Sequence, residues 1–227
     1  VYKAHQTFMD QTVALKVIRP ELGRDRNFRE RFLVEVKNAS RVRHPNAVQI
    51  LDAGESEEGL VYMAMEYVEG ESLTDLIGQH AAGMPLDLFR KLAGQMCAAL
   101  AAVHEKGIIH RDLKPDNILI QNENAGPQVK LLDFGISKLI QDPLDQEADT
   151  QAPTILGAMT PEYASPEQKR RERVTTASDL YSLGVILHEI LTGRRPEPEG
   201  GAQPSELRGD LGLVVAKALH EEPARRY

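Results

Sequence analysis

The segment Gly107–Ile120, GIIHRDLKPDNILI, constrains the fold of this chain more than any other stretch. Apolar, β-forming residues stand on both sides of a short polar loop, so two buried segments must meet there. The loop places an acid, a base and an amide at offsets of two and three residues: Asp112, Lys114 and Asn117. Such a group, gathered between buried segments, indicates a site for chemistry rather than a simple connection.

The first part of the chain predicts a small sheet with one helix. Residues 1–19 hold two runs of β-formers around a polar turn, and residues 47–54 and 59–68 hold two more around an acidic turn, so each pair predicts a hairpin. Between them, over residues 25–43, apolar side chains recur at three- and four-residue steps, which predicts a helix with one buried face. These side chains are Phe28, Phe32, Val36 and Ala39.

Helices dominate the prediction for the rest of the chain. One helical stripe leads to Gly107, which is placed to end its helix; the stripe consists of Leu88, Leu92, Met96, Leu100 and Val103. Residues 118–136 predict a third hairpin, and the polar, acidic residues 137–160 predict a long functional loop. Residues 177–193 are apolar almost all round and end in Gly193, which predicts a helix buried in the core.

Size and charge narrow the classes of protein. With 227 residues, 41% of them hydrophobic, the chain can bury a substantial core. Its 27 basic against 34 acidic residues give a net charge of −7, which does not favour a nucleic acid or an anionic membrane as partner. Any phosphate must therefore be held by local groups. No apolar stretch approaches the roughly 20 residues that a membrane span needs.

The single cysteine, Cys97, lies in the apolar run LAGQMCAALAAVH, which predicts a buried structural thiol. One cysteine excludes a disulfide within the chain. We therefore expect a reducing compartment, the cytoplasm.

Taken together, the motifs along the chain resemble, in order and spacing, those of protein kinases of the eukaryotic-like (Hanks) Ser/Thr type, and most closely the bacterial members. They are VALK (13–16), Glu35, MEYV (65–68), HRDLKPDN (110–117), DFG (133–135), SPE (165–167), Asp179 and Arg226. The resemblance implies an α+β, bilobal fold, with a small β-rich N-lobe at residues 1–68 and a larger helical C-lobe at residues 69–227.

The resemblance also implies that the family's first strand and Gly-rich loop precede Val1 and that its last helices follow Tyr227. We therefore expect the chain by itself to be weakly active or inactive.

The activity implied is transfer of the γ-phosphate of Mg-ATP to Ser and Thr hydroxyls of proteins, including autophosphorylation. In the family pattern, Asp112 would accept the incoming hydroxyl and Lys114 would stabilise the transferring phosphate. Lys16 would hold the α- and β-phosphates and pair with Glu35.

The same resemblance implies binding positions for the cofactors. The metal would be Mg²⁺, with Mn²⁺ as an alternative, and its ligands would be Asn117 and Asp133. The ATP-binding positions would be Val1, Ala14, Lys16, Met65, Glu66, Val68 and Leu119.

Regulatory and structural roles follow from the family pattern as well. A phosphorylated threonine, Thr150 or Thr154, would meet a basic cluster made of Arg31, Arg111 and Lys138. Thr160 would bridge the catalytic aspartate and lysine. The structural residues would be His110, Phe134, Glu167, Asp179 and Arg226, with Glu167 and Arg226 forming a pair.

Two other functions stay open at this point. The first is a pseudokinase or nucleotide-binding scaffold. Ala39 and Met159 favour it, because they depart from the residues usual in the family. The second is a small-molecule kinase of the same shape. Two features argue against it: the KP after Leu113 and the long segment that ends in SPE. The expected partners are ATP, protein substrates and a second copy for autophosphorylation, and a membrane tether outside this chain also stays open.

Overall fold

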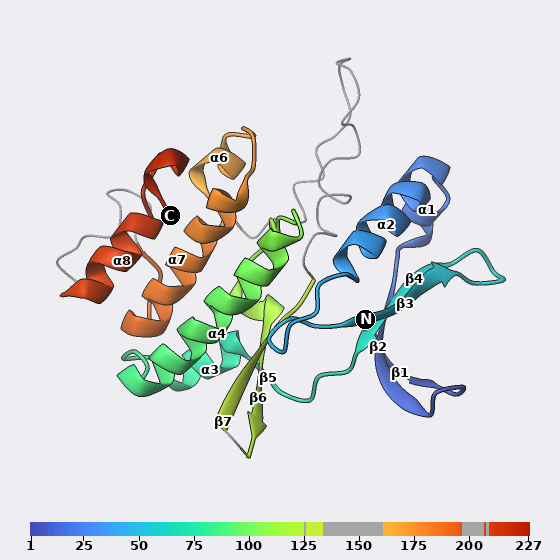
Figure 1. Ribbon diagram of the computed structural model, residues 1–227, viewed down its shortest axis with the longest axis horizontal. Coiled ribbons are helices and arrows are strands. Elements are labelled where there is room, and N and C mark those ends of the chain that lie inside the picture. The colour runs from blue at the N-terminus through green and yellow to red at the C-terminus, as the bar shows by residue number, and fades with distance from the viewer. Residues whose placement is uncertain (125, 134–160, 197–206, 208) are drawn as a thin grey trace.

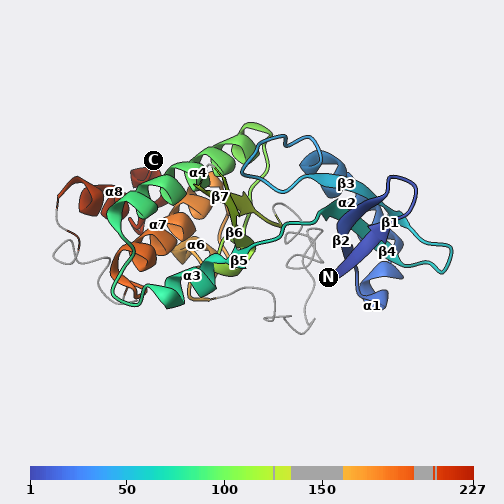
Figure 2. The same ribbon diagram turned by 90° about the horizontal axis from the view of Figure 1, so that it is seen from below.

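The computed structural model describes residues 1–124, 126–133, 161–196, 207 and 209–227. The chain forms two lobes, with the N-terminus in one and the C-terminus in the other (Figure 1). Seen from below, the smaller lobe holds strands β1–β4 and the larger lobe holds most of the helices (Figure 2). The boundary expected at residue 68 falls in the connection between strands β4 and β5.

The N-lobe is built on an antiparallel sheet in the order β1-β2-β4-β3. Its strands are β1 (Tyr2–Gln6), β2 (Gln11–Val17), β3 (Ile50–Glu55) and β4 (Val61–Glu66). Both predicted hairpins are present. In the pairing of β2 with β4, Ala14 lies opposite Met65 and Lys16 lies opposite Met63, so Lys16 is held on an inner strand.

Helix α2 (Arg26–Ala39) follows the short helix α1 (Pro20–Gly23) and packs its apolar stripe inward. Asp25 caps α2, because its carboxylate accepts from the backbone N–H groups of Asn27 and Phe28. All four predicted stripe residues are buried, which confirms the helical period. The helix ends at Ala39 rather than near residue 43, because the backbone N–H groups of residues 41 and 42 turn back to Asn38 and Ala39.

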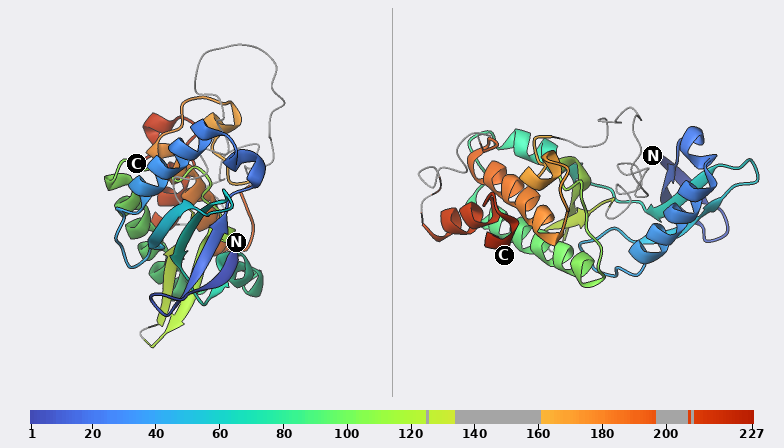
Figure 3. Two further views of the ribbon diagram at one scale, coloured as in Figure 1. Left: turned by 90° about the vertical axis from the view of Figure 1, so that its right-hand side faces the viewer. Right: turned by 90° about the horizontal axis from the view of Figure 1, so that it is seen from above.

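The C-lobe is mainly helical, with α4 beside α7 and α8 packed against α7 (Figure 3). Its longer helices are α3 (Leu73–Gln79), α4 (Leu86–Glu105), α7 (Thr176–Thr192) and α8 (Asp210–Ala218). Shorter turns are η1 (Pro115–Asn117), α6 (Pro166–Lys169) and η2 (Pro223–Arg225). In the parts of the chain that the structure describes, no helix has both the length and the apolar composition needed to cross a bilayer.

Gly193 ends α7 as the sequence predicts. Its φ of 75° lies in the left-handed region, and a Cβ there would collide with the carbonyl oxygen of Ala81.

A second sheet joins the two lobes. It contains β5 (Glu71–Ser72), β6 (Ile118–Glu123) and β7 (Gly126–Leu131) in the order β5-β6-β7. The far edge of β7 receives the loop that follows α2. There the Leu131 N–H donates to Asn46 O over 2.8 Å, and the Val48 N–H donates to Leu131 O over 2.8 Å. This docking fixes the position of the loop after α2 on the C-lobe.

Cys97 is exposed on α4, so the prediction of a buried thiol is wrong. The buried face of this helix contains Met96, Ala99 and Leu100. One residue is about 100° of rotation in a helix, so the position after Met96 is turned away from the core. The apolar run does not show on which face of the helix Cys97 lies, because small residues lie on both faces.

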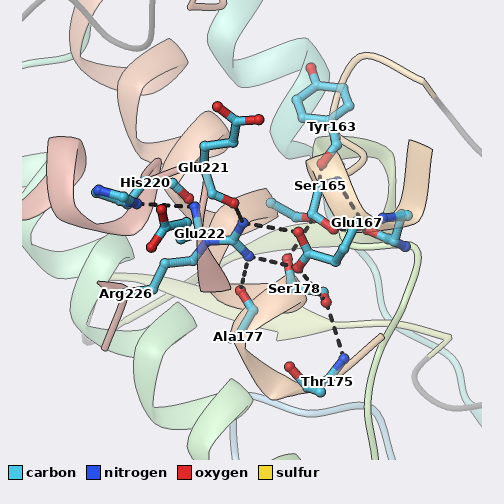
Figure 4. Close-up of polar contacts among 12 residues, drawn as sticks. Tyr163, Ser165, Glu167, Thr175, Ala177, Ser178, His220, Glu221, Glu222 and Arg226 are labelled. Atoms are coloured by element: carbon cyan, nitrogen blue, oxygen red, sulfur yellow. Dashed lines mark hydrogen bonds and ion pairs between the residues drawn. The ribbon is translucent and has the colours of Figure 1, made fainter. Parts of the chain in front are cut away.

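A buried ion pair closes the C-lobe around its last described residues (Figure 4). Arg226 donates to both carboxylate oxygens of Glu167, at 2.7 and 2.9 Å, and to three backbone carbonyls, those of Ala177, His220 and Glu221. Ser178 Oγ donates to the same carboxylate over 2.7 Å. Burial by itself raises the pKa of Glu167, but the hydrogen bonds from Arg226 and Ser178 outweigh it and lower the pKa to about 2.

We expect Glu167→Gln to lower the free energy of unfolding at pH 7 by about 3–5 kcal/mol, because it leaves the Arg226 charge buried without its carboxylate. The matched control is Glu30→Gln in the exposed pair with Arg26, for which the expected loss is below about 0.5 kcal/mol. Since the pKa of Glu167 is depressed, its stabilisation is complete above about pH 4.5 and is lost as the pH falls towards 2. Urea unfolding between pH 7 and pH 3 measures the free energy of unfolding, and the values for Glu167→Gln and the unmodified protein should approach each other as the pH falls. If Glu167→Gln and Glu30→Gln lost the same free energy of unfolding at pH 7, the stabilising role of the buried pair would be contradicted.

Candidate active site

Lys16 and Asp133 bring the two lobes into direct contact. Lys16 Nζ lies 2.8 Å from Asp133 Oδ2, although the two residues are 117 positions apart in the chain. Their side chains are 20% and 28% exposed, so the pair is partly shielded from water. A strand lysine of the N-lobe is therefore held against a residue just after β7.

The polar loop in front of β6 forms a second group of contacts. Lys114 Nζ lies 3.2 Å from Asp112 Oδ2. The amide nitrogen of Asn117 donates to the same carboxylate oxygen over 3.2 Å and to the Asp112 carbonyl over 2.7 Å. The acid, base and amide that stand at close offsets in the sequence thus contact one another through side chains.

One backbone bond ties this loop to the Lys16–Asp133 contact. The Leu132 N–H donates to the Asn117 carbonyl over 2.8 Å, so Asn117 lies beside the residue that precedes Asp133. The structure therefore brings together the four side chains that the motifs single out: Lys16, Asp112, Asn117 and Asp133.

Two backbone positions at this site have unusual conformations. Arg111 and Asp133 have φ angles of 69° and 55°, in the left-handed region that non-glycine residues rarely adopt. Each is adjacent to, or is itself, one of the converging residues. Strain of this kind persists where the surrounding structure enforces it, and it clusters at functional sites.

Asp133 and Asn117 have oxygen atoms that could bind a divalent cation. Asp133 Oδ1 is buried without a hydrogen-bond partner, while Oδ2 receives Lys16. Asn117 uses its amide nitrogen towards Asp112, which leaves the amide oxygen as the atom that a cation would bind. Carboxylate and amide oxygens are the ligands that Mg²⁺ prefers.

The described residues contain no group of three or more His, Cys, Asp or Glu side chains that could hold a metal ion. Mg²⁺ is usually held by one or two carboxylates together with water and phosphate oxygens. The pair Asn117 and Asp133 suits that mode, in which a nucleotide completes the coordination.

The ion pair expected between Lys16 and Glu35 does not form: within the described residues, Lys16 pairs with Asp133 instead. Glu35 lines a cavity of about 270 Å³ with Asn38, Arg111 and the segment 106–109. The physical reason is position: Glu35 faces this cavity, which Lys16 does not line, while Asp133 holds the ammonium group of Lys16.

The positions expected to contact adenine lie around the connection between the lobes. Ala14 is half-buried opposite Met65, which is 5% exposed, while Val1 at the chain start is 73% exposed. Leu119 and Val68 are half-buried.

The Glu66 backbone N–H already donates to the Gln49 carbonyl over 2.9 Å, so Glu66 can offer a nucleotide its carbonyl but not its N–H. Its side chain accepts from Lys130 of β7 at 2.9 and 3.0 Å. This contact between the lobes joins residues 64 positions apart, and no motif in the sequence indicated it.

His110 and Asp179 hold the start of the loop that carries Asp112 through buried hydrogen bonds. His110 is fully buried and its Nε2 lies 2.8 Å from the Leu132 carbonyl. Asp179 accepts the backbone N–H groups of His110 and Arg111 at 2.8 and 2.9 Å. A third contact, from His104 Nε2 at 2.7 Å, was not anticipated from the sequence, where the only signal was a histidine in the last turn of the helix before the loop.

Several expected residues lie outside the described ranges: Phe134, Lys138, Thr150, Thr154, Met159 and Thr160. The structural role expected for Phe134 and the bridge expected from Thr160 to Asp112 and Lys114 therefore stay predictions. In the basic cluster, Arg31 Nε donates to the Asn27 carbonyl, and Arg111 lines the cavity beside Glu35.

Fold and site together define a two-lobed α+β domain (Figure 1) with a cluster of charged and amide side chains where the lobes meet, and comparison with known proteins gives the family. The chain matches the model of the protein kinase domain over residues 1–221, and it belongs to the protein kinase family. The family and fold expected from the sequence are thereby confirmed.

Individual relatives are bacterial. The chain is 42% identical to the serine/threonine-protein kinase pkn3 of Myxococcus xanthus and 40% identical to PknB of Mycobacterium leprae, over all of this chain and 44% and 38% of those proteins. Among solved structures it is similar to the Mycobacterium tuberculosis PknI kinase domain, with a TM-score of 0.71 and 28% identity, over 96% of this chain and 81% of that one. The chain spans less than half the length of these curated relatives.

If Asp133 Oδ1 is a metal ligand, Asp133→Asn should remove most of the effect of Mg²⁺ on nucleotide affinity. Calorimetric titration with a non-hydrolysable ATP analogue, with and without MgCl₂, measures this effect. We expect Mg²⁺ to tighten binding to the unmodified protein and Asp133→Asn to reduce that gain by about tenfold or more. Asp116→Asn is the matched control, because Asp116 is exposed, precedes Asn117 and bonds only Thr74 among the described side chains. An unchanged Mg²⁺ effect in Asp133→Asn would contradict the assignment.

Proposed function

We propose that this protein is a serine/threonine protein kinase that transfers the γ-phosphate of Mg-ATP to Ser and Thr hydroxyls of protein substrates. One observation carries the proposal: the Asp112–Lys114 contact lies on a loop bonded, through Asn117, to the strand end where Asp133 meets Lys16. Family membership and the names of the relatives support it.

In this proposal Asp112 orients the substrate hydroxyl and accepts its proton as the oxygen attacks the γ-phosphorus. The bond from that phosphorus to the β–γ bridging oxygen breaks, and ADP leaves. Lys114, 3.2 Å from Asp112, supplies positive charge beside the transferring group. The Asn117 amide keeps the Asp112 carboxylate in place through its 3.2 Å bond.

The remaining residues of the site bind the nucleotide. Lys16 holds the α- and β-phosphates, and Asn117 and Asp133 hold Mg²⁺, or Mn²⁺, which neutralises charge on the phosphates. The adenine lies between Ala14 and Val1 on one side and Leu119 on the other. Met65 borders this slot, and the edge of the adenine is bound by the Glu66 carbonyl and the Val68 backbone.

The conformation described corresponds to a resting form of that enzyme. Lys16 is bound by Asp133, and Glu35 lines the cavity beside Arg111. Nucleotide phosphates would compete with Asp133 for Lys16, and a shift of α2 would bring Glu35 to the lysine. Phosphorylation of Thr150 or Thr154, received by Arg111 and Lys138, is the proposed regulatory event.

The proposed partners are ATP, cytoplasmic proteins that present Ser or Thr, and a second copy of the chain for autophosphorylation. Thr160 is proposed to bridge Asp112 and Lys114 when a substrate is bound. The single cysteine of the chain agrees with a cytoplasmic setting.

One observation favours a second candidate, a nucleotide-binding scaffold without turnover. The Lys16–Asp133 pair occupies both a phosphate-binding and a metal-binding group at once. A protein that kept this pair permanently would bind nucleotide weakly and would not transfer phosphate.

Phosphate transfer by the full-length protein separates the two functions. With radiolabelled ATP and a mixed Ser/Thr protein substrate, we expect Asp112→Asn to lower kcat by about 10²- to 10⁴-fold, because the acceptor of the hydroxyl proton is lost. The control is Asp87→Asn, an exposed aspartate in the first turn of α4 that should leave kcat unchanged. Equal transfer by the Asp112→Asn variant and the unmodified protein would overturn the kinase proposal.

A further inference from the structure

Gln168 is a buried side chain whose two polar atoms contact different segments of the C-lobe, and it is 7% exposed. Its Nε2 donates to the Arg111 carbonyl over 2.7 Å, while its Oε1 accepts from the N–H and the hydroxyl of Ser165 at 3.0 and 3.1 Å. These partners fix the orientation of the amide, because a carbonyl only accepts and a backbone N–H only donates. A flipped amide would place oxygen against oxygen at Arg111 and N–H against N–H at Ser165.

The carbonyl that Gln168 binds belongs to a residue in a rare backbone conformation. Arg111 has a φ of 69°, and its N–H donates to Asp179 Oδ1 over 2.9 Å. Gln168 holds the other side of the same residue, at the peptide group that joins Arg111 to Asp112. A left-handed residue persists where its surroundings enforce it, so this bond helps to hold the turn. Rotation of that peptide group would change the direction in which the Asp112 side chain leaves the backbone.

Gln168 is itself held on the C-lobe by contacts that lie outside the strained turn. It is the third residue of α6, where it forms a capping box with the N-cap residue, Ser165. The residue before it, Glu167, is 1% exposed and is bonded to Arg226 at 2.7 and 2.9 Å. The amide nitrogen of Gln168 therefore reaches the strained turn from a separately anchored helix.

We infer that Gln168 is a positioning residue for Asp112, because its amide N–H fixes the peptide group from which Asp112 begins. Through this one bond, the position of α6 and the orientation of Asp112 depend on each other. The kinetic consequence rests on the proposed function, in which Asp112 orients the substrate hydroxyl. The effect on the turn itself does not.

The competing explanation is that Gln168 serves only as part of the helix cap. The cap uses Gln168 Oε1, whereas the positioning role uses Nε2, so a substitution can separate the two. Gln168→Glu does so, since glutamate also completes a capping box but its ionised carboxylate has no hydrogen to donate. Gln168→Met removes both contacts while keeping a side chain of similar length.

The matched control is Gln95→Glu, which makes the same chemical change at the contact between α4 and β7. Gln95 is half-buried; its Nε2 donates to the Pro127 carbonyl over 2.9 Å, and its Oε1 accepts from the Val129 N–H over 2.8 Å. All variants are made in the full-length protein, and thermal unfolding of each one establishes that it folds.

The first readout is amide hydrogen exchange at Arg111 and Ser165, which requires no catalysis. We expect Gln168→Glu to speed exchange at Arg111 by about tenfold or more, because the turn loses one of its bonds, and to leave Ser165 unchanged. Gln168→Met should speed exchange at both amides, and Gln95→Glu at neither. The inference is overturned if Arg111 exchanges at the same rate in Gln168→Glu, or if it speeds up only together with Ser165, as loss of the cap would cause.

The second readout is the pH dependence of this effect. A protonated carboxyl group can donate a hydrogen bond, so the introduced acid regains a donor to Arg111 as the pH falls through its pKa. Burial and the neighbouring carbonyl oxygen both raise that pKa above the ordinary value for glutamate. From about pH 8 to about pH 5, the ratio of the Arg111 exchange rates in Gln168→Glu and the unmodified protein should fall towards one. The ratio for Gln168→Met should stay constant, and a constant ratio for Gln168→Glu would contradict a donor role.

The third readout is kinetic. Gln168→Glu should lower kcat by about tenfold or more with the KM for ATP nearly unchanged, because other residues bind the nucleotide. An unmodified protein that transfers no phosphate would count against the kinase proposal alone, while the exchange result would still decide the role of Gln168.

A second pair of variants covers the case in which Gln168→Glu does not fold. Ser165→Ala removes the cap hydroxyl and keeps the bond from Gln168 to Arg111, whereas Gln168→Met removes both. Exchange at Arg111 should then be faster in Gln168→Met alone. Equal exchange at Arg111 in these two variants would overturn the inference.

Discussion

The backbone at residues 131–133 is the junction on which the rest of the structure depends. Leu131 bonds the loop after α2 on one edge of β7, and Ile118 of β6 lies opposite it on the other edge. Leu132 bonds Asn117, and Asp133 receives Lys16. A single short stretch thereby positions the N-lobe, the loop that carries Asp112 and the Asp133 side chain relative to one another.

The two halves of the site differ in how firmly they are held. On the C-lobe side, Asp179 and the Glu167–Arg226 pair are buried. Breaking the contacts of a buried charge is costly, because the charge is left without water or a partner. On the N-lobe side, the Lys16 and Asp133 side chains are 20% and 28% exposed, so this pair is less buried than Asp179 and Glu167. We infer that the more buried contacts hold the loop that carries Asp112, and that the Lys16–Asp133 contact is the one that a nucleotide would exchange.

Much of this could be predicted from the sequence, because periodicity and motif order report on local structure. The helical stripe of α2, the hairpins and the buried helix α7 follow from spacing alone, and the ordered motifs located the converging side chains. Contacts set by tertiary geometry could not be read this way. Glu66 and Lys130 meet across the lobes, His104 reaches a helix far along the chain, and Cys97 points outward by the rotation of one residue. The partner of Lys16 depends on conformation, since Glu35 and Asp133 both suit it chemically.

We propose above all that Lys16, Asp112, Asn117 and Asp133 form one magnesium-nucleotide site between the lobes. A crystal structure of the protein with Mg²⁺ and a non-hydrolysable ATP analogue tests it most directly. The account predicts phosphate oxygens at Lys16 Nζ, the metal on oxygens of Asn117 and Asp133, and the γ-phosphate facing Asp112. A nucleotide bound elsewhere, or a metal that leaves Asp133 Oδ1 without a ligand, would contradict it.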